Sequence, residues 1–296
     1  MVRGSSPLLS FLGLRPPLSN FETARVVVIP VPYEGTVEWH TGTKDAPSAI
    51  INASNYLEFY DLELRTETHR LGIHTMGEVK PATGGPARMA GRVYQVVKTV
   101  VVRGKLPVVL GGEHSVTYGA VKAVREKHPR LSVLQLDAHT DLRDRYRGSR
   151  YGNACIMRRV SEICPVVQVG VRSSSLEEQE YVAKGGSRPV YAWEVDADGD
   201  YIDRVLGVLS GEVYVTIDLD VFDPAVMPAV GTPEPGGLSW QAVLALLRRV
   251  SLVKRIAGFD VVELCPAEGP ASCSYLAASL VYKMIGYALT GGRAYE

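Results

Sequence analysis

The sequence predicts one three-layer α/β domain, and two features of the chain indicate it. Short apolar runs alternate with helix-patterned stretches along the 296 residues, and no linker is long enough to separate domains. The apolar runs lack alternating polar residues, so both faces of each strand should be covered, as in a parallel sheet between helices. We therefore expect residues 1–296 to form a single domain, with residues 1–22 as an N-terminal arm that packs on it.

The expected strands are six short runs rich in Val, Ile and Leu. They span residues 25–30, 106–110, 131–136, 166–171, 213–219 and 255–259. The expected helices have apolar residues at helical spacing and span residues 87–102, 115–127, 239–250 and 275–290. Ser239 stands at the capping position of the third helix, and the fourth is apolar enough to be largely buried.

Composition excludes several classes of protein. Lys plus Arg equals Asp plus Glu at 32 each, so a net charge of zero argues against nucleic acid or an anionic membrane as the partner. No apolar run approaches the roughly 20 residues that cross a bilayer. The cysteines have no C-x-x-C spacing, which argues against a thiolate zinc site and favours free thiols in a reducing cytoplasm. They are Cys155, Cys164, Cys265 and Cys273.

Ionisable residues gather directly after three of the expected strands, where open parallel sheets bind their ligands. GGEHS follows residues 106–110, DAHTD follows 131–136, and DLD ends the run 213–219. Residues two apart in an extended chain project to one side, so each of the last two segments presents neighbouring side chains together. The three segments supply two imidazoles and four carboxylates: His114, Asp137, His139, Asp141, Asp218 and Asp220.

Four crowded carboxylates would repel one another without cations, and a pair of divalent ions removes that conflict. Ligands that are mostly carboxylate oxygen, with one imidazole for each ion, suit Mn²⁺, although Zn²⁺, Fe²⁺ and Co²⁺ are also compatible with them. A lone D-x-D, or a lone histidine after two glycines, would be an ordinary structural feature. All three segments together predict a two-metal site.

GGEHS, DAHTD and DLDVFDPAVMPAVGTPEPGG resemble signatures of the arginase/agmatinase (ureohydrolase) family. The similarity runs from VPYEGTVEWHTGTKDAPSAI to GFDVVELCP, and DAHTDLRDRYRGSRYGNACIMRR and QVGVRS look closer to agmatinase-like members. The segment with which arginases read the substrate's α-carboxylate is not seen. The resemblance implies an arginase-like fold with a parallel, mostly eight-stranded sheet, and two Mn²⁺ per chain held by the six residues above.

The resemblance also implies roles for individual residues. The implied catalytic residues are Asp141 and Glu263. Asp141 would also ligate metal, and Glu263 matches the glutamate that pairs with the substrate guanidinium. Asp223 matches a supporting position, and residues 224–237 would form an ordered loop beside the metals. Asn153, in the substrate loop, departs from the family pattern, because agmatinase-like sequences carry histidine there. An amide cannot move a proton at neutral pH.

The implied activity is hydrolysis of a guanidino compound to urea and an amine, with agmatine or N1-aminopropylagmatine as the first substrates to consider. Putrescine or spermidine would be the amine product. Hydrolysis of another C–N bond, in a formimino, amide or guanidino-acid substrate, is an alternative. A catalytically impaired metal-binding paralogue or regulatory subunit is a third, because of Asn153. The resemblance further implies a homo-oligomer, a trimer or a hexamer.

Overall fold

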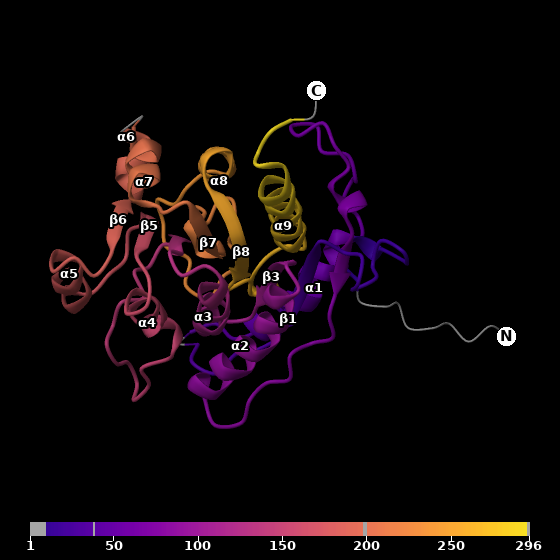
Figure 1. Cartoon of the computed structure of the whole chain (residues 1–296). Coiled ribbons are helices and arrows are strands. Elements are labelled where there is room, and N and C mark those ends of the chain that lie inside the picture. The colour runs from indigo at the N-terminus through magenta and orange to yellow at the C-terminus, as the bar shows by residue number, and fades with distance from the viewer. Residues whose placement is uncertain (1–9, 38, 198–199, 295–296) are drawn as a thin grey trace.

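The computed structural model describes residues 10–37, 39–197 and 200–294 (Figure 1). Its centre is an eight-stranded sheet with the order β2-β1-β3-β8-β7-β4-β5-β6. All strand pairs among the described residues are parallel, which confirms the predicted sheet. The strands are β1 Val26–Val31, β2 Ile73–Thr75, β3 Leu106–Gly111, β4 Ser132–Leu136, β5 Val166–Val171, β6 Arg188–Tyr191, β7 Glu212–Asp218 and β8 Arg255–Val262.

Each of the six predicted runs becomes a strand, and two edge strands were not predicted. β2 and β6 are short and partly exposed, so they carry little apolar signal. The last strand is longer than predicted, because Asp260 interrupts the apolar run without ending the strand. Asp260 is fully buried and accepts hydrogen bonds from Tyr214 (2.8 Å) and Thr216 (2.5 Å) of the neighbouring β7, which satisfy its carboxylate inside the sheet.

The helices cover both faces of the sheet (Figure 1). Alternate residues of β1 show this, since Val26 packs in one core cluster with α1, α7, α8 and α9, while Val27 packs in another with α2, α3 and α4. Ser239 caps α8 by accepting a hydrogen bond from Ala242 N at 3.1 Å, as predicted. The helices are α1 Ala46–Ser54, α2 Pro86–Val102, α3 Thr117–Lys127, α4 Ile156–Ser161, α5 Leu176–Ala183, α6 Ala192–Ala197, α7 Tyr201–Val208, α8 Trp240–Val253 and α9 Ser272–Thr290.

The expected N-terminal arm is described only from residue 10, and residues 1–9 lie outside the described residues. The Phe11 side chain is fully buried, and its backbone N–H donates to Thr75 Oγ1 at 2.9 Å. The N–H of Leu12 donates to Ser54 Oγ at 2.7 Å. The described part of the arm therefore docks on β2 and on the end of α1.

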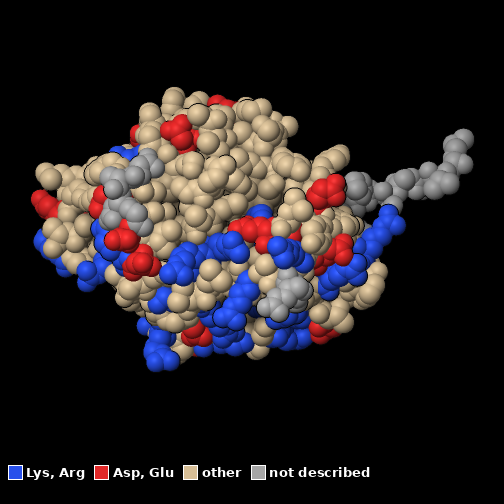
Figure 2. Space-filling model, turned by 90° about the horizontal axis from the view of Figure 1, so that it is seen from above, with Lys and Arg blue, Asp and Glu red and all other residues tan. Residues whose placement is uncertain are grey.

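Charge is unevenly spread over the surface, although the formal net charge is zero. The face in Figure 2 carries a broad band of Lys and Arg side chains across the lower half of the view. Zero net charge therefore does not mean a uniformly neutral surface. Among the described residues, no helix combines the length and apolarity needed to cross a membrane.

Candidate metal centre

The candidate side chains lie at the carboxyl ends of four adjacent strands in the middle of the sheet. These strands are β3, β8, β7 and β4. β4 ends at Leu136, directly before Asp137, and β7 ends at Asp218. His114 opens the short 3-10 turn that follows β3. Glu263 comes directly after β8. Because parallel strands end at a common edge, segments far apart in the sequence meet there.

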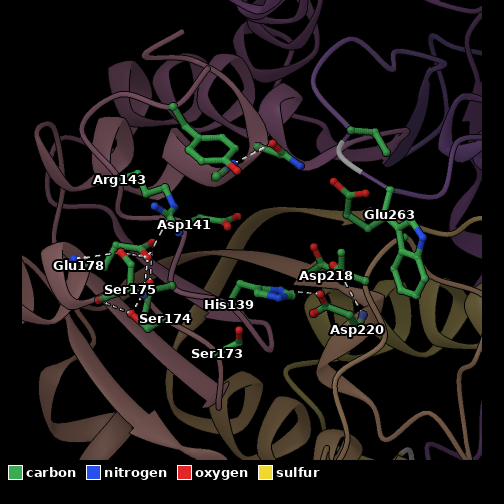
Figure 3. Close-up of a pocket in the computed structure, with 18 residues that line it drawn as sticks. His139, Asp141, Arg143, Ser173, Ser174, Ser175, Glu178, Asp218, Asp220 and Glu263 are labelled. Atoms are coloured by element: carbon green, nitrogen blue, oxygen red, sulfur yellow. Dashed lines mark hydrogen bonds and ion pairs between the residues drawn. The ribbon is translucent and has the colours of Figure 1, made fainter. Parts of the chain in front are cut away.

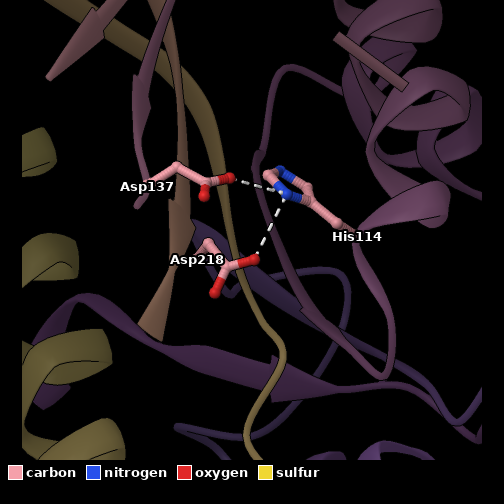
Figure 4. A group of neighbouring side chains, drawn as sticks. All are labelled: His114, Asp137 and Asp218. Carbon is pink, nitrogen blue, oxygen red and sulfur yellow. Dashed lines mark ion pairs between the residues drawn. The ribbon is translucent and has the colours of Figure 1, made fainter. Parts of the chain in front are cut away.

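The first group of candidate ligands surrounds the imidazole of His114. Its Nδ1 atom lies 3.1 Å from Asp137 Oδ2, 3.1 Å from Asp141 Oδ2 and 3.4 Å from Asp218 Oδ2. Figure 4 shows the side chains of His114, Asp137 and Asp218 pointing toward one another. All of these residues are buried, so the structure gathers one imidazole nitrogen and three carboxylates away from solvent.

The hydrogen bonds of His114 test whether a cation fits this group. Its Nε2 lies 2.9 Å from Thr216 Oγ1, and Thr216 Oγ1 donates to Asp260 Oδ1 at 2.5 Å. The threonine hydroxyl has thereby used its proton and accepts one from Nε2, so Nε2 carries the ring proton of the neutral imidazole. Nδ1 faces the carboxylates, which, against the effect of burial, raise the pKa of His114 well above its ordinary value, so a metal ion would take the place of a proton on this nitrogen. Such a cluster of acceptors fits a metal ion.

The second group consists of Asp137, His139 and Asp220. His139 Nδ1 lies 2.8 Å from Asp220 Oδ2 and 3.6 Å from Asp137 Oδ1. Each group offers one potential ligand atom per residue, and within a group these atoms all lie within 4.8 Å of one another. The first such set is His114, Asp137 and Asp218, and the second is Asp137, His139 and Asp220. Asp137 belongs to both groups, so the two candidate sites are neighbours.

Without cations, most of these acids are hard to ionise, whereas Asp137 is not: burial opposes its ionisation, but hydrogen bonds to His114 and His139 hold its pKa below the ordinary value. Burial and the Asp137 carboxylate raise the pKa of Asp141 to about 7. Burial and the Glu113 carboxylate raise the pKa of Glu263 to about 8. Burial and neighbouring carboxylates raise the pKa of Asp218 well above its ordinary value. Divalent cations would favour the ionised carboxylates and reverse these shifts, which is a further fit of the donor set to metal.

Both expected catalytic residues have a left-handed backbone. The φ angle is 53° at Asp141 and 65° at Glu263, a region that residues with a side chain rarely adopt. Such strain persists only where the surroundings hold it, and it is concentrated at functional sites. Glu263 Oε1 accepts a hydrogen bond from His114 N at 2.6 Å, which ties Glu263 to the first ligand group.

A cavity of about 250 Å³ opens over the two groups and is lined by Asp141, Asn153, Asp218, Asp220 and Glu263, among others. In Figure 3, Glu263 lies on one side of the cavity and Arg143 and Glu178 on the other, with His139 between them. The cavity therefore has room for a molecule whose planar end group lies beside Glu263, near the candidate metal ligands, and whose remainder extends along the cavity.

Asn153 borders this cavity and is held by a polar network. Its N–H donates to Thr36 Oγ1 at 3.1 Å, and its Oδ1 accepts from Ala154 N at 2.9 Å and from the Thr36 hydroxyl at 3.3 Å. Thr36 Oγ1 also lies 2.9 Å from Glu113 Oε1. Glu113, directly before His114, accepts hydrogen bonds from Gly35 N and the Thr36 hydroxyl and thus anchors the segment that carries Thr36, the partner of Asn153.

Comparison with known proteins identifies the family of the chain. The model of the Arginase family matches residues 24–286, which is most of the sequence. The chain belongs to the arginase family. This arginase-family chain is 38% identical to N(1)-aminopropylagmatine ureohydrolase of Synechocystis sp. over 91% of each chain. It is 36% identical to agmatinase of Pyrococcus horikoshii, over 91% of this chain and 94% of the relative.

A solved structure shares the fold of this arginase-family chain. The crystal structure of agmatine ureohydrolase of Thermoplasma volcanium matches with a TM-score of 0.86 and 32% identity, over 95% of this chain and 94% of that one. The family resemblance expected from GGEHS, DAHTD and the long third segment is therefore confirmed, together with the fold class.

Sequence reasoning missed the polar residues that support the arginase-family cluster from within the strands. Gln135 Nε2 donates to Asp137 Oδ2 at 2.6 Å, and Gln168 Nε2 donates to Gln135 Oε1 at 2.5 Å. Thr216 contacts His114 as described above. Each interrupts an apolar strand with a fully buried polar side chain. That interruption was the available signal, since a buried polar group requires a partner.

Proposed function

We propose that this chain hydrolyses a guanidino compound to urea and an amine at a centre of two Mn²⁺ ions. The observation that carries the proposal is that two His/Asp groups, buried except for the partly buried His139, share Asp137 and face the same cavity as Glu263. Membership of the arginase family and relatives named ureohydrolase and agmatinase support a hydrolase that acts on guanidino compounds. The proposed metal ligands are His114, Asp137, His139, Asp141, Asp218 and Asp220.

In this proposal, His114, Asp137, Asp141 and Asp218 hold the first ion, whereas Asp137, His139 and Asp220 hold the second. Mostly carboxylate oxygen, with one imidazole in each group, is a ligand set that suits Mn²⁺. The ions, when bound, supply the lowered water pKa that produces a nucleophile at neutral pH.

The residues around the ions bind and orient the substrate. The Glu263 carboxylate accepts N–H groups of a planar guanidinium, a pairing that is strong because both partners are charged. Asp141 lies in the cavity wall beside the first ligand group, and we propose that it accepts a hydrogen bond from the nucleophile. The tail of the substrate extends along the cavity past Asn153, whose amide can hydrogen-bond but cannot shuttle a proton.

Agmatine and N1-aminopropylagmatine are the substrates we propose first, because relatives are named for reactions on these two compounds. We further propose a homo-oligomer, a trimer or a hexamer, that works in the cytoplasm. The four described cysteines are all free and buried, which is compatible with a reducing compartment.

Asn153 favours a second candidate function, a metal-binding paralogue or regulatory subunit without fast turnover. No titratable group stands at the position where agmatinase-like sequences have histidine. Loss of a general acid typically costs about 10²–10⁴-fold in rate. Metal binding would be unaffected by this loss, so only kinetics separates the two candidates.

The deciding experiment measures metal content and urea release on the same protein. Metal-free protein is titrated with Mn²⁺ and then offered agmatine, N1-aminopropylagmatine, arginine and 4-guanidinobutyrate. The proposal expects two ions per chain and urea from at least one compound. Two bound ions without urea from any of them would favour the paralogue. A protein that binds no ion would contradict both candidates.

A further inference from the structure

Arg172, directly after β5 in the segment QVGVRS, connects the strand ends around the second ligand group. Among the described residues, its side chain hydrogen-bonds to backbone carbonyls and to no carboxylate. The acceptors are the carbonyl oxygens of Gly170 (3.0 Å), Asp220 (2.7 Å), Val221 (3.5 Å), Phe222 (3.3 Å), Glu234 (2.8 and 3.2 Å) and Pro235 (3.1 Å). One guanidinium therefore joins the end of β5, the segment after β7 and a distant loop.

Three hydrogen bonds close a circuit around the ligands. Ala138, between Asp137 and His139, donates its N–H to Asp220 Oδ1 at 2.9 Å. The N–H of Arg172 donates to the carbonyl of Ala138 at 2.8 Å. Arg172 Nη2 then donates to the carbonyl of Asp220 at 2.7 Å. The circuit fixes the ends of β4, β5 and β7 relative to one another, and so fixes the spacing of the two ligand segments.

The same guanidinium reaches the loop of residues 223–237. Asp223 Oδ2 accepts hydrogen bonds from Gly236 N (2.9 Å) and Gly237 N (3.1 Å), which closes the base of this loop. Arg172 holds the Glu234 carbonyl inside it, and the loop lines the cavity with Gly231 and Thr232. Arg172 thus couples the cavity wall to the backbone of Asp220.

Arginine suits this place for a physical reason. The guanidinium presents five N–H donors in a rigid planar fork, whereas lysine has three donors on a flexible stem. Carbonyls from three segments can be satisfied at once by the fork and only in part by an ammonium group.

We propose that Arg172 is a positioning residue for the second ligand group, Asp137, His139 and Asp220. Its side chain is not among the residues that line the cavity and is not one of the proposed ligands. It holds Asp220 and Ala138 at the separation that lets the group bind its ion. The inference rests on the proposed two-ion centre.

The test compares Arg172→Ala and Arg172→Lys with wild type in a Mn²⁺ titration by calorimetry and electron paramagnetic resonance. Arg248→Ala is the matched control, because Arg248 is also part-buried and bonds Gly292 O (3.1 Å) and Glu63 (3.1 Å) away from the centre. In Arg172→Ala, the second ion should bind roughly 10–100-fold more weakly, the usual effect of losing a group that orients ligands. The first ion should bind as in wild type, Arg172→Lys should fall between, and Arg248→Ala should leave both unchanged.

A second measurement needs no metal. Hydrogen exchange of the backbone amides in residues 218–238 of metal-free protein should be faster in Arg172→Ala than in wild type or Arg248→Ala. The inference is overturned if both ions weaken equally, if Arg248→Ala has the same effect, or if neither affinity nor exchange changes. If wild type itself binds no Mn²⁺, the proposed function fails, whereas the exchange result still judges the positioning role.

Discussion

The Nε2 atom of His114 lies 2.9 Å from the hydroxyl oxygen of Thr216. Because Thr216 gives its own proton to Asp260, this contact keeps a ring proton on Nε2 and leaves Nδ1, which faces the carboxylates, as the nitrogen that can ligate a metal. A residue in the middle of β7 therefore decides which nitrogen of His114 can ligate a metal. The same arrangement leads to the first prediction.

Thr216→Val should weaken Mn²⁺ binding at the first ligand group by roughly 10–100-fold, because the imidazole loses the partner that fixes its tautomer and orientation. Valine matches threonine in shape, and the buried Asp260 keeps its hydrogen bond from Tyr214, so the fold should persist. Calorimetric titration with Mn²⁺ measures the effect. Thr99→Val is the control, since within the described part of the chain the Thr99 hydroxyl hydrogen-bonds only to Val96 O of its own helix, at 2.7 Å. Equal affinities in both variants and wild type would contradict the role of Thr216.

Glu263→Gln should lower kcat/KM for the guanidino substrate by about 10–100-fold, the equivalent of losing one charged hydrogen bond worth roughly 1.5–3 kcal/mol. The amide oxygen can still accept the bond from His114 N, so Mn²⁺ binding should be unchanged. Urea release measured over a range of substrate concentrations gives kcat and KM. Unchanged kcat/KM at full metal occupancy would show that the guanidinium pairs elsewhere.

Asn153→His should raise kcat, by at most about 10²–10⁴-fold, if proton transfer to the leaving amine limits turnover. A new pH dependence near the ordinary histidine pKa of about 6.5 should accompany the gain. Steady-state urea release as a function of pH measures both. If kcat and the pH profile do not change, the proton already reaches the amine by another route, and the idea of an impaired site is wrong.

Glu63 should stabilise the packing of α9 in a pH-dependent way. Burial alone would raise its pKa, but hydrogen bonds from Tyr287 (2.7 Å) and Lys283 (2.9 Å) and nearby positive charges lower it. A carboxylate whose pKa is lower in the folded protein than in the unfolded chain stabilises the fold at pH values above its unfolded-state pKa. This stabilisation is lost as the pH falls through its folded-state pKa.

Glu63→Gln should therefore cost about 1–2 kcal/mol of unfolding free energy at neutral pH, and the gap to wild type should shrink below roughly pH 4. Urea denaturation at several pH values checks it. Glu67→Gln removes a partner of the exposed Arg70 and should cost less, about 0–1 kcal/mol. A gap for Glu63→Gln that is independent of pH would contradict the prediction.

Much of the architecture could be predicted because it depends on local pattern. Continuous runs of Val, Ile and Leu indicated buried parallel strands, and six of the eight strands were found this way. The short edge strands β2 and β6 could not be, since a few half-exposed residues carry no distinctive pattern. β8 was predicted too short at Asp260, because the partners that satisfy that carboxylate come from another strand.

Taken alone, the sequence determined the fold class, the family and the six candidate ligands, because residue type and spacing at strand ends are local properties of the chain. Only the tertiary structure decided which atoms face one another: that Asp137 belongs to both ligand groups, that Thr216 orients His114, and that Arg172 spans three strand ends. Those relationships join residues tens of positions apart. Strand order and side-chain direction set them, and neither can be read from a single segment.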